Sequence, residues 1–246
     1  MEAWREHRIL ITGAARRLGA HLAETLVREG AEVALHFHTS QAEAEALATR
    51  LRRTEGRLHL FAADLGDETQ LERLADEVTA TCGPLTGLVN NASVYTRTPL
   101  DRVSRAQWRT MQQVNSEAPI WLATRLGRAM QQAGRGSIVN VGDWSIIKPY
   151  RGYLPYTASK GSLTVASRAL ARELAPQVRV NVIAPGPMLL RPEDPESLEA
   201  RIRRAVPLGR LGGPEAFTQA ALFFLGHASA YCTGTVLHVD GGRNLA

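Results

Sequence analysis

The sequence is poor in cysteine and lysine. Among 246 residues only Cys82 and Cys232 are cysteines, and neither has a second cysteine at the spacing of a metal-binding or redox motif. We therefore expect two free thiols in a reducing compartment, no disulfide and no metal site. Lysine occurs only as Lys148 and Lys160, so arginines spread among glutamates carry almost all of the positive charge, and the net charge is +5.

The sequence also lacks the runs that would direct it to a nucleic acid or a membrane. No basic stretch or basic-aromatic stripe stands out, so we expect a small-molecule partner, preferably anionic, and no nucleic acid. No apolar run reaches the ~20 residues needed to span a bilayer. Residues 1–8 are polar and carry two glutamates, unlike a secretory signal. These absences predict a cytoplasmic protein.

What the sequence does contain is a regular alternation of short β-rich runs and helix-period segments. With 44% hydrophobic and 22% charged residues, it can bury a sizeable core. The alternation predicts a Rossmann-like, doubly wound α/β fold, a single domain over residues 1–246 with a seven-stranded parallel sheet. Strands are predicted at 8–12, 32–37, 58–62, 88–90, 137–141, 178–183 and 235–239. Helices are predicted at 18–29, 41–54, 69–82, 156–174 and 196–205.

A glycine turn separates the first predicted strand from its helix. Gly13 and Gly19 would let the backbone approach a pyrophosphate, whose charge the helix N-terminus can meet. The spacing is wider than in the commonest dinucleotide fingerprint, and Arg17 stands where a middle glycine is expected. An ordinary β-α turn is the alternative interpretation.

Residues with polar or turn character follow directly after several predicted strands. In doubly wound sheets, ligands bind beyond the carboxyl ends of the strands. We therefore expect the site near Gly13, Asp64, Asn91, Asp143 and Pro185. The irregular segment after Pro185, together with the short helix that follows, predicts a substrate loop at about 187–205.

The best candidates for chemistry are Tyr156 and Lys160. Residues four apart on a helix are neighbours, so the ammonium group can favour the ionised phenol and lower its pKa from about 10. A phenol in that position can donate a proton near neutral pH. Taken alone, the pair could also be an ordinary surface tyrosine and lysine.

Taken together, these motifs resemble the short-chain dehydrogenase/reductase family over nearly the whole chain. They are, in the family's order, Thr12-Gly13 with Gly19, Asp64-Leu65, Asn90-Asn91-Ala92, Asn115, Tyr156 with Lys160, Pro185-Gly186 and Val239-Asp240-Gly241-Gly242. The resemblance implies a tetramer that binds NAD(P), with Asn115 holding water in a proton relay through Lys160 and Tyr156. The cofactor-binding residues that it implies are Gly13, Arg16, Arg17, Leu18, Gly19, Asp64, Leu65, Asn91, Ala92, Lys160, Pro185 and Gly186.

Three departures from the family pattern resemble its pteridine reductase branch. Asp143 replaces the usual serine, Ser93 replaces the glycine after Asn-Asn-Ala, and Arg17 replaces the middle glycine; the run from His36 to Ser40 also matches. The substrate-contacting residues that this resemblance implies are Arg17, Ser93, Tyr95, Asp143 and Tyr156. Tyr95 would serve as a stacking platform for a flat heterocycle.

The end of the second predicted strand indicates which cofactor is used. NAD-dependent enzymes place an acid there for the ribose hydroxyls. This chain has His38, Thr39 and Ser40 instead, with Arg16 and Arg17 in the first turn, so we expect NADPH. Thr39 stands where the branch often has an arginine, so we expect weaker binding of the 2′-phosphate of NADPH.

The resulting hypothesis is an NADPH-dependent reductase that transfers hydride to a C=N bond of a pterin, a dihydropterin or dihydrofolate. Tyr156 or Asp143 would supply the proton. A carbonyl reductase, such as a 3-oxoacyl thioester reductase, is the first alternative; it would want a serine at position 143 and could use Ser145. A cofactor-binding sensor without turnover is the second, although such a protein has no need of Asn115, Tyr156 and Lys160 as a relay.

Overall fold

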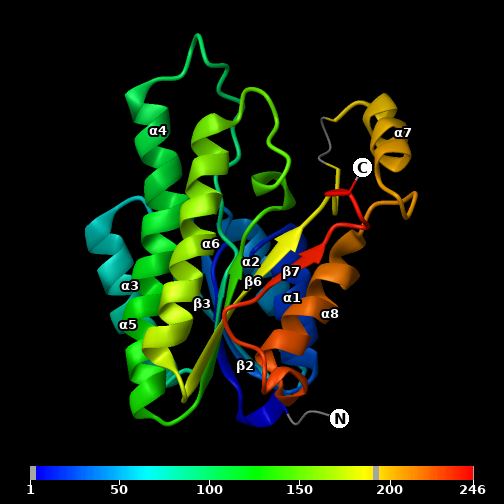
Figure 1. Ribbon diagram of the computed structural model, residues 1–246. Helices are drawn as coiled ribbons and strands as arrows, with labels where there is room; N and C mark the ends of the chain where they lie inside the picture. Colours follow the sequence, from blue (N-terminus) through cyan, green and yellow to red (C-terminus); the bar gives the residue numbers. More distant parts are fainter. Residues whose placement is uncertain (1–3, 191–193, 246) are drawn as a thin grey trace.

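In the computed structural model, which describes residues 4–190 and 194–245, seven parallel strands form one sheet (Figure 1). The strand order is β3-β2-β1-β4-β5-β6-β7, so the order reverses between β1 and β4. This confirms the predicted doubly wound fold and puts a topological switch point, where such sheets bind ligands, at the centre of the carboxyl edge. The strands are β1 (Arg8–Ile11), β2 (Glu32–Phe37), β3 (Arg57–Ala62), β4 (Gly87–Asn90), β5 (Gly136–Val141), β6 (Val178–Pro185) and β7 (Val236–Val239).

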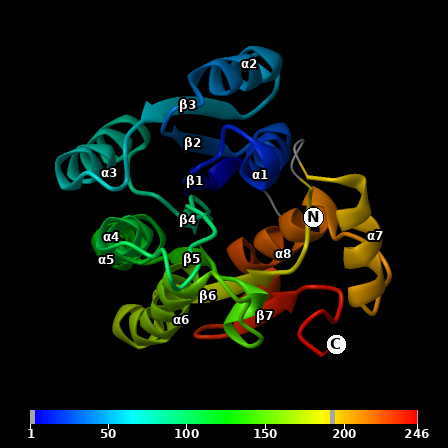
Figure 2. The same ribbon diagram turned by 90° about the horizontal axis from the view of Figure 1, so that it is seen from above.

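Helices cover both faces of the sheet, as the view from above shows (Figure 2). One apolar core contains residues of α1 (Arg17–Arg28), α2 (Gln41–Leu51) and α8 (Gly213–Leu225). The core on the opposite face contains residues of α3 (Glu68–Cys82), α5 (Ala118–Gln132) and α6 (Leu154–Leu174). Two further helices, α4 (Arg105–Gln112) and α7 (Glu196–Ala205), lie at the end of the molecule toward which the strands point (Figure 1).

The strands are apolar because helices bury them from both sides. In β2, Val33 and Leu35 belong to the first core, whereas Ala34 between them belongs to the second. Successive side chains of a strand point to opposite faces, so a strand with two covered faces needs an almost continuous apolar run. Two polar residues, His36 and Asn90, lie near the carboxyl ends of β2 and β4, where the site lies.

The element bounds differ from the sequence-based expectation mainly at the ends. β6 continues to Pro185, α2 already ends at Leu51, and β7 begins at Val236. Three helices, α4, α5 and α8, lie outside the ranges predicted from the sequence. Residues 191–193 of the predicted substrate loop, like residues 1–3 and 246, lie outside the described part of the chain. Within that part, none of the helices combines the length and apolar character needed to cross a bilayer.

Candidate active site

Hydrogen bonds from neighbouring strands fix the turn between β1 and α1. The amide of Gly13 donates to Nδ1 of His36 at 3.1 Å, and Nε2 of the same ring donates to the carbonyl of Ala63 at 3.0 Å. Burial lowers the pKa of His36 to about 4, so the ring stays neutral near pH 7 and keeps both roles. His36 thus ties the ends of β1, β2 and β3 together, a role that its sequence motif did not reveal.

The same turn leaves no room for side chains at its glycines. A Cβ on Gly13, whose φ is +62°, would lie 2.9 Å from the Cα of Ala92. A Cβ on Gly19 would lie 2.7 Å from Nδ2 of Asn91, which itself donates to the carbonyls of Thr12 and Gly13. The N-cap residue of α1, Arg16, makes no side-chain capping bond. The first amides of α1 are therefore available to an anion, which fits the predicted phosphate site.

Arg17 has an uncommon backbone conformation, and its side chain points toward the segment after β6. Its φ is +56°, which makes it the one described non-glycine residue with positive φ. The position thus keeps the backbone conformation of the glycine that Arg17 replaces. Its guanidinium donates to the carbonyls of Leu189 and Leu190 at 3.0 and 3.1 Å. Arg17 therefore binds the first residues of the predicted substrate loop.

The corner predicted to hold the 2′-phosphate lies at the start of α2. Ser40 is the N-cap of α2 and makes no side-chain capping bond, and His38 and Thr39 are exposed. Arg16 lies 3.5 Å from Glu43 in the first turn of this helix. The Glu43 carboxylate therefore competes with a bound phosphate for the Arg16 guanidinium.

Asp64 follows β3 at the same corner. Its Oδ1 accepts a hydrogen bond from the amide of Gly66 at 2.8 Å, and its Oδ2 lies 3.8 Å from Nε2 of His38. The neighbouring Leu65 is buried in the second core. Asp64 therefore shapes the loop after β3 and still lies within reach of a group bound near His38.

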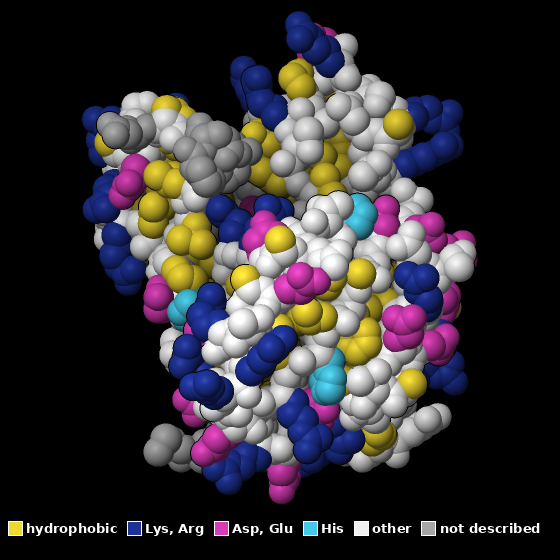
Figure 3. All heavy atoms as spheres, turned by 180° about the vertical axis from the view of Figure 1, so that it is seen from behind, with side chains coloured by type: hydrophobic (Ala, Val, Ile, Leu, Met, Phe, Trp, Pro, Cys, Tyr) yellow, Lys and Arg dark blue, Asp and Glu magenta, His cyan; other side chains and the backbone are white. Residues whose placement is uncertain are grey.

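A cleft of about 690 Å³ opens at the carboxyl edge of the sheet. In Figure 3 the surface is hollowed between the projection that carries α7 and the one formed by the tops of α4 and α6. Of the predicted site residues, the cleft is lined by Arg17, Leu18, Asn91, Ser93, Tyr95, Asp143, Tyr156, Lys160, Pro185 and Gly186. The other predicted cofactor residues (Gly13, Arg16, Gly19, His38, Thr39, Ser40, Asp64, Leu65 and Ala92) are not part of its lining.

Asp143 and Tyr156 are in direct contact inside the cleft. The Tyr156 hydroxyl donates to Oδ2 of Asp143 at 2.6 Å, and Oδ1 accepts from the amide of Ser145 at 2.7 Å. Asp143 follows β5 and is the N-cap of the short 3-10 helix η3 (Trp144–Ile146). Its carboxylate is therefore held by one backbone donor and offers its second oxygen to the phenol.

The pKa of Tyr156 contradicts the sequence-based expectation. Burial, followed by the charge and hydrogen bond of Asp143, raises the pKa of Tyr156 well above 10, whereas we expected Lys160 to lower it. Lys160 lies with Nζ 6.0 Å from the centroid of the phenol ring and donates to the carbonyl of Val141 at 2.8 Å. The expectation was wrong because helical spacing says nothing about burial or about the carboxylate between the strand end and the helix.

Lys160 is one of the largest fully buried side chains. Burial lowers its pKa to about 8, with Asp143 acting in the opposite direction. A lysine with such a pKa can exchange its proton near neutral pH. Asp143 and Tyr156 thus form a hydrogen-bonded pair, and the buried Lys160 lies beside the phenol ring.

Asn115 lies close by, in a π-helical turn, η2 (Gln113–Glu117), between α4 and α5. Its Oδ1 accepts from the amide of Val94 at 2.7 Å and from the Ser93 hydroxyl, and its Nδ2 donates to Val94 O and Ser159 Oγ. π-Helical turns are frequent at functional sites. These contacts show Asn115 positioning the loop that carries Ser93; its part in a water relay stays a prediction.

An aromatic cluster that the sequence analysis missed forms one wall of the cleft. Tyr95 stacks on Tyr153 with a centroid distance of 4.7 Å and meets Tyr156 edge-on at the same distance. The cluster continues through Tyr150 to Trp144, over which the guanidinium of Arg243 lies at 4.9 Å. One face of the Tyr95 ring is thus covered. No signal in the sequence paired these residues, because they come from three separate segments.

Arg243 lies in the C-terminal segment, after the Asp240-Gly241-Gly242 motif. In this chain it lines the cleft and donates to the carbonyl of Ala205 at the end of α7 at 3.1 Å. Asp240 lies next to Gly186, where an added Cβ would be 2.6 Å from the Asp240 Cα. The Pro185-Gly186 and Asp240-Gly241-Gly242 motifs therefore meet at one side of the cleft.

Comparison with known proteins gives matches over the full chain. The family model described as Enoyl-(Acyl carrier protein) reductase matches residues 13–244. The chain is 33% identical to the 3-oxoacyl-[acyl-carrier-protein] reductase FabG of Escherichia coli over 95% of both chains. It is 32% identical to the gluconate 5-dehydrogenase of Gluconobacter oxydans, covering 96% of this chain and 93% of that protein.

Solved structures resemble the whole fold. The FolM alternative dihydrofolate reductase 1 of Brucella canis, complexed with NADP, has a TM-score of 0.90 and 33% identity and covers 99% of this chain and 96% of its own. The corresponding Brucella suis protein, also in complex with NADP, has a TM-score of 0.89 and 32% identity over 98% and 97%. The chain is thus equally similar in sequence, at 33% identity, to FabG of Escherichia coli and to the FolM protein of Brucella canis. With full-length matches above 30% identity and the fold described above, the chain belongs to the short-chain dehydrogenase/reductase family of oxidoreductases.

Proposed function

We propose that the protein is an NADPH-dependent reductase that transfers hydride to a C=N bond of a pterin or dihydropterin, with dihydrofolate as a related substrate. One observation carries the proposal: the Asp143 carboxylate lies in the cleft and accepts the Tyr156 hydroxyl hydrogen bond at 2.6 Å. The FolM structures from Brucella, which carry the name of a dihydrofolate reductase, support it.

A carboxylate at this position suits a pterin better than a ketone. During ketone reduction the oxygen gains negative charge, which a neighbouring carboxylate opposes because it cannot donate a hydrogen bond. A pterin ring offers N–H and amino donors that a carboxylate can accept. Its reduced nitrogen also needs a proton, which the Tyr156 hydroxyl beside the carboxylate can supply.

Different residues of the cleft would transfer the proton and contact the substrate. Tyr156 keeps its proton because its pKa is raised, and its hydroxyl already donates to Asp143. The Asp143–Tyr156 pair can therefore deliver one proton to a ring nitrogen, while Lys160, with a pKa lowered to about 8, can replace it. Ser93 and Tyr95 line the same cleft and would contact the ring.

The first turn would hold the cofactor, which supplies the hydride when bound. The uncapped N-terminus of α1 and the close backbone at Gly13 and Gly19 suit the pyrophosphate. Ser40 and Arg16 would bind the 2′-phosphate of NADPH. The residues that follow β2 do not include the acid that NAD-dependent enzymes use for the ribose hydroxyls. The Brucella structures are NADP complexes, which supports the same choice.

A carbonyl reductase acting on a 3-oxoacyl thioester is the second candidate. The identity of 33% to FabG favours it. Ser145, the substitute hydroxyl that the sequence offered, is buried at 3% exposure beside Asp143. On this proposal Asp143 would not take part in proton transfer.

An NADPH-oxidation assay run in parallel on dihydrobiopterin, dihydrofolate and an acetoacetyl thioester separates the two candidates. We expect turnover of at least one of the two pterin-type substrates and little or none of the thioester. Turnover of the thioester alone would refute the pterin proposal. Binding of NADPH without turnover of any of them would leave the cofactor-binding sensor as the better description.

Two further expectations are proposals as well. We infer a homotetramer from the resemblance to the family, and a cytoplasmic location from the two isolated cysteines, which suit a reducing compartment. Sedimentation analysis of the purified protein tests the first, because a tetramer of the 26.8 kDa chain differs clearly from a dimer or monomer. Fractionation of the producing cells tests the second.

A further inference from the structure

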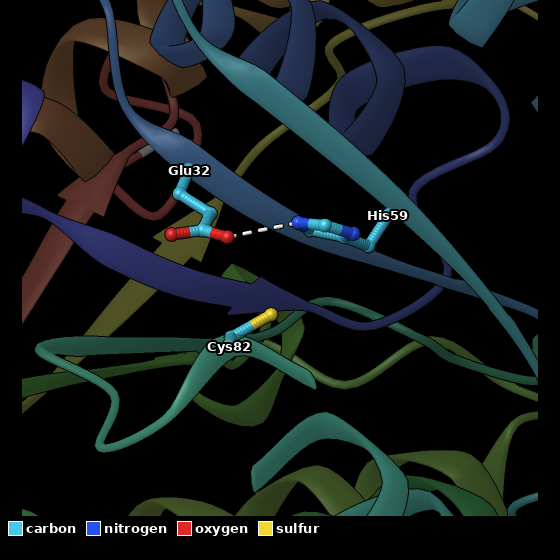
Figure 4. A group of neighbouring side chains, drawn as sticks. All are labelled: Glu32, His59 and Cys82. Carbon is cyan, nitrogen blue, oxygen red and sulfur yellow. Dashed lines mark hydrogen bonds and ion pairs between the residues drawn. The ribbon is translucent and has the colours of Figure 1, made fainter. Parts of the chain in front are cut away.

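A second group of reactive side chains lies at the opposite edge of the sheet from the cleft. Glu32 is the first residue of β2, His59 is in β3, and Cys82 ends α3. One ligand atom from each of these residues lies within 4.8 Å of the other two. Figure 4 shows Glu32 and His59 joined by a hydrogen bond of 2.8 Å, with the Cys82 sulfur directed toward the pair.

Strand register explains why these side chains meet. β2 and β3 pair so that Ala34 is opposite His59, and Glu32 lies two residues before Ala34 on the same face. Ala34 and Cys82 both belong to the core on the α3 side of the sheet. The three residues therefore sit at the lower rim of that core, where α3 returns to the sheet edge.

We propose that Glu32, His59 and Cys82 form a Zn²⁺ site with three protein ligands and one position open to water. Thiolate sulfur, imidazole nitrogen and carboxylate oxygen are the ligands that zinc uses, and zinc sites with three protein ligands keep an open fourth position. The mixed sulfur, nitrogen and oxygen set excludes Mg²⁺ and Ca²⁺, which prefer oxygen alone.

The geometry needs only small shifts. Ligand atoms around a tetrahedral zinc are about 3.5 Å apart when the bonds are about 2.0–2.3 Å long. The cysteine sulfur must approach by about 1 Å from its present place, and the Glu32–His59 pair must open slightly from 2.8 Å. Side-chain rotation can provide such movements, because Glu32 and His59 are partly exposed, at 20% and 31% of their side-chain surfaces.

Two features of the site oppose the binding of Zn²⁺. Arg8 donates to the carbonyl of Cys82 at 3.2 Å, which places a positive charge beside the site. The thiol is buried, and zinc must displace its proton into the solvent together with any proton on His59 Nε2. The Glu32 carboxylate and the thiolate formed on binding together compensate the Zn²⁺ charge.

This site departs from the sequence-based expectation that the chain has no metal site. Zinc bound there would join β2, β3 and the end of α3, the elements whose other ends carry His38 and Asp64. The open fourth position would remain available to water or another small ligand, at the edge of the sheet away from the proposed chemistry. The inference does not rest on the proposed pterin activity.

Cobalt(II) is the probe that reports on these ligands directly. The full-length protein is treated with a chelator, desalted and titrated with Co²⁺ in the absence of cofactor and substrate. We expect one equivalent to produce a thiolate-to-cobalt charge-transfer band in the near ultraviolet and the visible bands of a four-coordinate ion. Zn²⁺ should remove both sets of bands. Absence of the charge-transfer band would overturn the proposal, because it would mean that only exposed histidines or carboxylates bind the ion.

Variants assign the ligands. Cys82→Ser should abolish the charge-transfer band, whereas the matched control Cys232→Ser should retain it. His59→Gln should lower the Zn²⁺ affinity by at least about 10- to 100-fold, the loss found even for partners outside the ligand set. It serves as the test if the serine variant does not fold. A band that survives Cys82→Ser, or one that is lost in Cys232→Ser, would refute the site.

Discussion

The two halves of the candidate active site are built in different ways. The cofactor half, at the ends of β1 to β3, is fixed by hydrogen bonds to backbone atoms from Thr12, His36 and Asn91. The substrate half joins side chains from η3, α6, the loop after β4 and the C-terminal tail through ring contacts. The geometry of the first half therefore depends on a few polar side chains that bind backbone atoms, whereas that of the second depends on the packing of aromatic rings.

Three residues connect the halves. Arg17 belongs to the first turn but binds the carbonyls of Leu189 and Leu190. Lys160 and Asp143 lie where the cleft reaches the carboxyl ends of β5 and β6. The comparison therefore predicts that substitutions at the first turn affect the cofactor, those in the wall affect the substrate, and those at the connection affect both or the proton transfer.

The largest effect is expected at Asp143. Asp143→Asn and Asp143→Ala should lose ~10²–10⁴ in pterin turnover, the usual contribution of general acid catalysis, and keep the affinity for NADPH. The reason is that both variants remove the group that can pass a proton but leave the first turn intact. Steady-state turnover and NADPH titration by fluorescence measure the two quantities. Near-normal turnover of the Asn variant would take Asp143 out of the mechanism and favour the carbonyl reductase, for which Asp143→Ser should gain some activity on a small ketone.

Lys160 predicts a dependence of stability on pH. Its pKa falls from 10.5 in the unfolded chain to about 8 in the folded one, so unfolding takes up a proton between these values. The free energy of unfolding should therefore rise with pH from about 8 to 10.5 in the wild type relative to Lys160→Met, by at most about 3–4 kcal/mol, since one pKa unit is about 1.4 kcal/mol. Urea denaturation of both proteins at several pH values measures it. If the difference in unfolding free energy between the two proteins did not change with pH, folding would not lower the pKa of Lys160.

Ser40 tests the cofactor half. Ser40→Asp should shift the preference from NADPH toward NADH by about tenfold or more, because a carboxylate repels the 2′-phosphate and accepts from ribose hydroxyls. Aspartate is also a good N-cap, so α2 should keep its stability. The ratio of kcat/KM for the two cofactors is the readout, and Ser40→Ala is the control that adds no charge. An unchanged ratio would place the phosphate elsewhere.

Arg17 tests the connection between the halves. Arg17→Gly keeps the positive φ without strain and removes the two hydrogen bonds to the loop, so the KM for the pterin should rise about tenfold. Arg16→Ala, which removes the neighbouring guanidinium beside Glu43, should mainly raise the KM for NADPH. If Arg17→Gly changed only the NADPH constant, Arg17 would belong to the cofactor half alone.

The smallest effect is expected in the aromatic wall. Tyr95→Ala should weaken pterin binding by about 1 kcal/mol or more, whereas Tyr95→Phe should be nearly silent, because the ring rather than the hydroxyl provides the platform. Tyr153 covers one face of the ring, so only its remaining surface can meet a substrate. Inhibition constants of a non-reducible pterin compare the variants. Equal losses in both would assign the contribution to the hydroxyl.

The sequence by itself determined the fold and the position of the site along it. Apolar runs separated by helix-period segments indicate a parallel sheet covered by helices, and Gly13, Asn91, Asp143 and Pro185 are then expected at its carboxyl edge. Periodicity and strand ends are local properties, which explains why the strand bounds agree with the structure to within a residue or two.

Only the tertiary structure decided which side chains touch. The sequence placed Lys160 beside Tyr156 and missed the burial and the Asp143 bond that raise the phenol's pKa. It also did not indicate that His36 binds the backbone of the first turn or that Arg17 binds the predicted substrate loop. Nor did it indicate that Glu32, His59 and Cys82 lie close together. Each of these depends on contacts between residues far apart in the chain, and on the removal of water around them. Neither property is contained in the spacing of residues along a single strand or helix.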